Sequence, residues 1–183
     1  MTSIDSPTLR ASARRAYEHA RLKLGARMAL LVVPMVTLSF ATGQEPLLTV
    51  LAGITLLALV VSFTWQGQVL GRAVLPGLAA GCAPLLLPLV MRQGGACCIG
   101  GVCCSMCLLG CVIGGAIAGT SIGVAAGAEH EQRWSFLSAA SLISGAAGVL
   151  GCALIGAAGI AAMALSVVLA SLPVAVIARV RGV

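Results

Sequence analysis

The sequence predicts an all-α, polytopic integral membrane protein with about six transmembrane helices and an N-terminal amphipathic interfacial helix. First, 60% of the 183 residues are apolar and only 9% are charged, whereas soluble domains are about half apolar and a quarter charged. Second, the apolar residues gather in runs of about 20, the length that crosses a bilayer as a helix. Third, the 23 glycines suit the close contacts of packed membrane helices.

Residues 1–27 form the one sizeable polar segment and are predicted to be a basic amphipathic helix on the cytoplasmic membrane surface. Ser6 and Pro7 are typical of a helix start. The basic residues there are expected to contact anionic lipids: Arg10, Arg14, Arg15, Arg21, Lys23 and Arg27. Because aromatic residues do not alternate with these charges, we expect no nucleic-acid partner. A solvated charged arm is the alternative interpretation.

Residues 28–181 are predicted to form the transmembrane helical bundle. The expected spans are about 28–42, 47–65, 73–91, 97–128, 135–155 and 160–178. Three prolines within the third span predict a kinked or partly unwound helix: Pro76, Pro84 and Pro88. Residues 135–178 would measure about 65 Å as one helix, over twice the hydrocarbon thickness. They are therefore predicted to form a hairpin that turns at residues 156–159.

Charge placement predicts the orientation of these spans. With the N-terminus inside, the inner segments are 1–27, 66–72, 129–133 and 179–183, and the one Lys or Arg residue of the eleven that falls outside them is Arg92. This distribution follows the positive-inside rule and predicts both termini in the cytoplasm. The short loops and the Arg- and Ala-rich composition indicate the inner membrane of a bacterium. Alternatively, residues 28–40 are the apolar core of a signal peptide, with a cleavage site at residues 39–41.

Glycines recur every four residues along the fourth predicted span, at Gly115, Gly119, Gly123 and Gly127. This glycine zipper predicts a groove in which another helix backbone approaches closely, within one chain or between copies. A homo-oligomer or a larger membrane complex is therefore among the expected partners, beside the lipid bilayer.

The cysteines carry the main chemical signal of the sequence. Six of the eight lie within fifteen residues: Cys97, Cys98, Cys103, Cys104, Cys107 and Cys111. At about 100° per residue, the last four of these fall on one helical stripe, with Cys97 beside them and Cys98 on another face. We expect Cys82 to lie at a similar depth and Cys152 near the outer end of the fifth span. The thiols are thus predicted to gather in the outer half of the bundle.

Thiolate and thioether ligands select Cu(I) and other soft ions. Vicinal cysteines on a membrane segment, such as Cys97-Cys98 and Cys103-Cys104, resemble those of bacterial mercuric-ion transport proteins. The sequence Cys82-Ala-Pro84 is also similar to a cysteine-then-proline context in that family. The resemblance implies that the cysteines here bind a soft ion such as Hg(II).

The leading hypothesis is a protein that binds or passes a soft metal ion, Cu(I) or Hg(II), and is not an enzyme. Its expected ligands are Cys82, Cys103, Cys104, Cys107 and Cys111, with Cys97 and Cys98 at the entrance. One alternative is a non-catalytic assembly subunit, packed through glycine and stabilised by disulfides. A second is a thiol–disulfide oxidoreductase that uses the C-x-x-C motif Cys104-Ser-Met-Cys107. The predicted spans hold no Asp, Glu, Lys or Arg, which disfavours a proton-coupled transporter.

Overall fold

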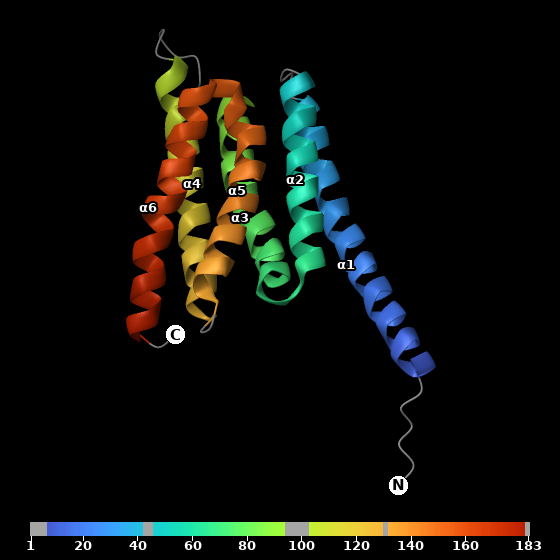
Figure 1. Ribbon diagram of the computed structural model, residues 1–183. Coiled ribbons are helices and arrows are strands. Elements are labelled where there is room, and N and C mark those ends of the chain that lie inside the picture. Colours follow the sequence, from blue (N-terminus) through green and yellow to red (C-terminus); the bar gives the residue numbers. More distant parts are fainter. Residues whose placement is uncertain (1–6, 42–45, 94–102, 130–131, 182–183) are drawn as a thin grey trace.

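The computed structural model describes residues 7–41, 46–93, 103–129 and 132–181, and this part of the chain is helical apart from short turns (Figure 1). The long helices are α1 (Pro7–Ala41), α2 (Pro46–Gln66), α3 (Gln68–Gln93), α4 (Cys103–Gly127), α5 (Arg133–Cys152) and α6 (Ala157–Arg181). Each of these six helices is long and apolar enough to cross a membrane. The predicted fold class, an all-α multi-pass membrane protein with six spans, is therefore confirmed.

The helices form a bundle with α3 and α5 at its centre, between two outer helix pairs. In Figure 1, α1 and α2 run side by side at one edge, and α4 packs along α6 at the other. Between them α3 packs along α5, and α3 also contacts α4. Fully buried side chains fill both sides of this centre: Leu56 and Val74 toward α1 and α2, and Ile122 and Met163 toward α4 and α6. Each of two core clusters is thus built where four helices meet: α1, α2, α3 and α5 in one, and α3, α4, α5 and α6 in the other.

The first helix is longer than the sequence predicts. α1 has 35 residues, about 52 Å of continuous helix, and projects beyond the bundle at its N-terminal end (Figure 1). The basic segment and the first span are therefore one element, and the predicted surface helix is the first part of α1. The physical reason is local, because only Gly25 weakens the helix near the junction, and good helix formers such as Ala26 and Arg27 follow it.

Two glycines make the sharp turns. Gly67 has a φ of 68° and separates α2 from α3, so the predicted break at residues 66–72 is a single residue. Gly156 has a φ of 84° and follows a short 3₁₀ turn, Ala153–Ile155, before α6 begins. A positive φ is a conformation that glycine adopts without the steric cost of a β-carbon. The predicted hairpin between the last two spans is present and turns at Gly156.

The third span stays helical through its prolines. Pro76, Pro84 and Pro88 all lie inside α3, which continues from Gln68 to Gln93. The span is therefore a continuous helix and not partly unwound, and the other predicted form, a kink at the prolines, stays a prediction. Membrane helices tolerate proline where neighbouring helices support the interrupted backbone, and Pro84 and Pro88 are fully buried between helices.

One end of the bundle carries polar contacts, and we call it the basic end. There Arg72 forms an ion pair with Glu129, with 3.5 Å between Nη1 and Oε1. Arg133 donates from Nη1 to the carbonyl oxygen of Ala175 at 3.2 Å. The start of α1 and the end of α6 lie at this same end in Figure 1. The opposite end, where α4 begins and α5 ends, we call the sulfur end.

Two buried serines differ in how their hydroxyl groups are satisfied. Ser39 of α1 donates to the Met35 carbonyl oxygen at 3.0 Å and lies 3.4 Å from the Leu150 carbonyl oxygen of α5. The hydroxyl of Ser144, also fully buried, has no hydrogen-bond partner among the described residues. A buried hydroxyl without a partner costs free energy that an apolar methyl group does not.

We therefore expect Ser144→Ala to leave the stability unchanged or to raise it by about 1 kcal/mol. Ser39→Ala, the matched control, should lower it by about 0.5 kcal/mol because a contact between helices is lost. The thermal midpoint of the detergent-purified variants measures both effects. A large loss of stability in Ser144→Ala would contradict the unpaired hydroxyl.

Candidate functional site

A disulfide joins two helices at the sulfur end. Cys111 of α4 and Cys152, the last residue of α5, are bonded with their Cα atoms 6.1 Å apart, although 41 residues separate them in sequence. Both cysteines are fully buried. This geometry brings together two of the cysteines that the sequence places in the outer half of the bundle. It also makes Cys152, which was not among the predicted metal ligands, the direct partner of one that was.

The local sequence explains why these cysteines approach. Gly110 and Gly114 flank Cys111, and an added β-carbon on Gly114 would lie 2.7 Å from the Pro84 Cα atom of α3. Gly151 precedes Cys152, and its β-carbon would lie 2.6 Å from the Pro84 carbonyl oxygen. Both cysteine-bearing helices therefore rest on the same turn of α3, and only glycine leaves room for this contact.

The carbonyl group of Pro84 has a particular position beside this pair. Pro88 stands four residues later and lacks an N–H group, so it cannot close the usual helical hydrogen bond to Pro84. The Cys152 sulfur lies 3.8 Å from that carbonyl oxygen. When the disulfide is reduced, the Cys152 thiol has an acceptor for its proton at this oxygen, so the buried site accommodates a thiol as well as a disulfide.

Two further sulfur atoms belong to the same end. An added β-carbon on Gly110 would lie 3.1 Å from the Met91 sulfur, so this thioether packs on α4 next to Cys111. Cys107 stands one helical turn before Cys111 and is disulfide-bonded as well. The site therefore combines sulfur atoms from α3, α4 and α5.

The remaining predicted ligands on this segment are described only in part. Cys103 and Cys104 lie on α4 with Cys107 and Cys111, but their side chains are outside the described part, and Cys97 and Cys98 lie wholly outside it. Within the described residues, no group of three or more His, Cys, Asp or Glu side chains could hold a metal ion. A site with three or more thiol ligands at this end therefore needs cysteines outside the described part as well.

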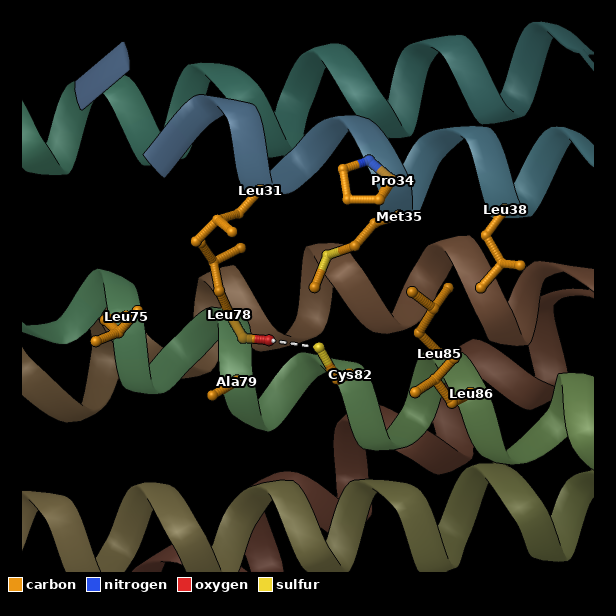
Figure 2. A pocket seen from close by; sticks show the side chains of 10 residues that line it. All are labelled: Leu31, Pro34, Met35, Leu38, Leu75, Leu78, Ala79, Cys82, Leu85 and Leu86. Atoms are coloured by element: carbon orange, nitrogen blue, oxygen red, sulfur yellow. Dashed lines mark hydrogen bonds between the residues drawn. The ribbon is translucent and has the colours of Figure 1, made fainter. Parts of the chain in front are cut away.

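Cys82 lies elsewhere, in a pocket between α1 and α3 (Figure 2). This apolar pocket has a volume of about 360 Å³. Figure 2 shows Met35 and Leu38 of α1 opposite Cys82, and the thiol donates to the Leu78 carbonyl oxygen at 3.4 Å. Among the described cysteines, Cys82 is the free one. The expected convergence of Cys82 with the cysteines of α4 is not what the structure shows, because the face of α3 toward α4 presents Pro84 and Pro88 instead.

No protein-family model, curated protein or solved structure matches this chain. The resemblance to mercuric-ion transport proteins therefore stays a prediction from the paired cysteines. What the site does has to be argued from its own sulfur atoms.

The predicted glycine groove faces α6 of the same chain. An added β-carbon on Gly115 would meet the Ser166 hydroxyl oxygen, one on Gly119 would meet the Val167 carbonyl oxygen, and one on Gly123 would lie 2.8 Å from the Ser171 carbonyl oxygen. Gly127, the last residue of α4, is buried too. The sequence leaves open whether this groove packs within one chain or between two copies. The contacts described here lie within one chain.

The predicted lipid-facing residues lie on α1. Arg15, Lys23 and Arg27 are exposed, as a charged surface in contact with headgroups requires. Arg10, Arg14 and Arg21 lie on the same helix, but their side chains are outside the described part.

Three elements of the site were missed by sequence reasoning. The pairing of Cys111 with Cys152 has no signature in sequence, because spacing does not specify connectivity. The contact of Pro84 with α4 and α5 depends on how these helices pack against α3, which the sequence does not show. Gly148 and Gly151, which let α5 approach Met163 and α3, were a recoverable signal, since small residues at helical spacing indicate a contact face.

Gly119→Leu should separate α4 from α6, because its side chain would overlap the α6 backbone at Val167. We expect a loss of about 1–3 kcal/mol, the usual cost of overpacking, visible as a lower thermal midpoint in detergent. Gly145→Leu is the control, because an added β-carbon there has nothing within 4 Å. Equal effects of the two variants would contradict the assignment.

Proposed function

We propose that this protein binds a soft metal ion, or passes one across the membrane, at the sulfur end of the bundle. The single observation that supports this is the juxtaposition of Cys111 and Cys152 from two helices, with the Met91 thioether packed on the neighbouring residue. Thiolate and thioether groups are the ligands that Cu(I) and Hg(II) prefer. Elsewhere in the described part of the bundle, Cys82 and Met35 line one apolar pocket, but no second cysteine meets them there.

The disulfide is the oxidised form of this site. Two electrons and two protons from a thiol reductant convert it into two thiols, and each thiol releases its proton when its sulfur binds a metal ion. Two cysteines close enough to form a disulfide are also close enough to bind one ion between them after a small movement. In this proposal the reduced protein is the one that binds metal.

The remaining cysteines of α4 extend the site toward the sulfur end. Cys103, Cys104 and Cys107 precede Cys111 on the same helix, at the spacing that predicts a single stripe. An ion would move along this stripe from one thiol pair to the next, with Cys97 and Cys98 nearest the outside. Cys82 forms no part of this path, since it lies in the separate pocket between α1 and α3.

We further propose that the basic end lies in the cytoplasm of a bacterial cell and that the protein is not an enzyme. The support for the orientation is charge, because Arg92 is the one Lys or Arg residue of the eleven that belongs to an outer segment. This orientation places the cysteines toward the outer face, where soft ions arrive. A labelling reagent that cannot cross the membrane should therefore reach residues 94–95 from outside.

The metal proposal is tested on reduced, oxygen-free protein in detergent, loaded with Cu(I) and separately with Hg(II). Cys111→Ser/Cys152→Ser is expected to bind at least one ion fewer per chain than the parent protein. Cys104→Ser/Cys107→Ser should lose metal as well, whereas Cys82→Ser, the matched control, should bind as many ions as the parent. Metal content measured by mass spectrometry, with circular dichroism to confirm folding, decides the outcome. If both double variants bound as many metal ions per chain as the parent protein, the proposal would be wrong.

A second candidate function is a non-catalytic membrane subunit that the disulfide and the glycine contacts hold together. The observation that favours it is the complete burial of Cys111 and Cys152, which restricts access by reductants and ions alike. This candidate predicts that the cysteines isolated from membranes are paired and carry no metal. The oxidoreductase alternative predicts one labile disulfide with quinone-dependent turnover.

For the structural candidate, Cys111→Ala/Cys152→Ala should destabilise the protein by up to about 4 kcal/mol, the loop-closure value for a link across 41 residues. The thermal midpoint without reductant measures this loss. The parent protein should fall to the midpoint of the variant when its disulfide is reduced. A variant as stable as the parent would show that the link is not structural.

A further inference from the structure

An apolar groove lies between α1 and α2 close to the basic end. It has a volume of about 210 Å³ and is lined by small residues of α1, Gly25, Ala26 and Ala29, and by Val61 and Trp65 of α2. The groove exists because these residues leave space between the helices. At Gly25, an added β-carbon would come no closer than 3.7 Å to Thr64.

The depth of the groove matches the boundary between headgroups and acyl chains. Trp65 is 57% exposed and stands one residue before the end of α2 at Gln66. Tryptophan is enriched at this boundary because its ring is amphipathic. Val61 lies about 6 Å deeper along the helix. The groove therefore begins at the membrane interface and runs toward the hydrocarbon.

The charges around the groove are mostly positive. From Pro7 to Ala29, α1 carries six basic residues and one acidic residue, Glu18. Lys23 is exposed and directly follows the groove residue Leu22, whereas the exposed Arg27 lies on the side of α1 opposite the groove. Long basic side chains can extend their charge toward the headgroup region while their stems cover apolar surface.

We propose that this groove binds one anionic phospholipid, with an acyl chain between α1 and α2 and its phosphate at Lys23. An apolar slot that opens at the interface fits an acyl chain, and the excess of positive charge at its mouth selects an acidic headgroup over a neutral one. This site does not depend on the metal proposal, which concerns the opposite end of the bundle.

The test uses the fluorescence of Trp65 in a Trp134→Phe background, so that one tryptophan reports. The protein is placed in phosphatidylcholine nanodiscs that contain a small fraction of acyl-brominated phosphatidylglycerol or of acyl-brominated phosphatidylcholine. Bromine quenches tryptophan on contact. We expect half-maximal quenching at a several-fold lower fraction of the anionic lipid.

Lys23→Gln should reduce this preference by about fivefold, whereas Arg27→Gln, on the side of α1 opposite the groove, should reduce it less. Arg15→Gln is the matched control, because it removes the same charge from α1 about 15 Å away from Gly25 and should change the preference little. Ala29→Phe fills the groove and should reduce quenching by both brominated lipids while all charges stay in place. Circular dichroism of each variant confirms that it is folded.

Four outcomes would overturn the proposal. Equal quenching by the two lipids would show that the groove does not select an anionic headgroup. An equal effect of Arg15→Gln and Lys23→Gln would show a diffuse attraction to the surface. Loss of the preference in millimolar inorganic phosphate would indicate a phosphate site without an acyl chain. A dimer in nanodiscs that shields Trp65 from both lipids would assign the groove to a second copy of the chain.

Discussion

The structure depends on the close approach of helix backbones that glycine permits. In a membrane, lipid tails are as apolar as leucine, so helices gain little by hiding apolar side chains from lipid and associate through close packing instead. Here α4 uses one glycine face against α6, at Gly115, Gly119 and Gly123, and another against α3, at Gly110 and Gly114. A helix that is in contact on two sides has little freedom to tilt. The positions of Cys107 and Cys111 on α4 follow from this constraint.

The sulfur end is a consequence of the same packing. Pro84 stands where α4 and α5 both reach α3, beside Gly114 and Gly151. Each glycine precedes or follows a cysteine within three residues, so close backbone contact at Pro84 brings the two sulfur atoms into bonding range. The prolines that were expected to unwind α3 serve instead as the surface on which the cysteine-bearing helices meet. Packing and sulfur chemistry are therefore coupled in this protein.

The two ends of the bundle differ in chemistry. At the basic end, Arg72 of α3 pairs with Glu129, which follows α4, and Arg133 of α5 donates to a carbonyl group of α6. At the sulfur end, Cys111 and Cys152 are buried and bonded to each other, and the half-buried Cys107 is disulfide-bonded as well. The two ends of the bundle therefore differ, with charged side chains at one and sulfur atoms at the other. The two proposed sites, for a metal ion and for a lipid, follow this asymmetry.

The sequence by itself determined the six spans, the hairpin of the last two spans and the cysteine-bearing helix, because hydrocarbon forces each apolar run of about 20 residues to satisfy its own backbone hydrogen bonds as a helix. Tertiary structure alone decided which residues meet: Cys111 with Cys152, Gly119 with α6, and Cys82 with a pocket on α1. Spans are predicted from local hydropathy, which can be read from the sequence without knowing which helices pack together. Contacts between helices depend on rotation about each helix axis, and with apolar side chains on all faces of α3 and α4 the hydropathy of the sequence does not specify that rotation.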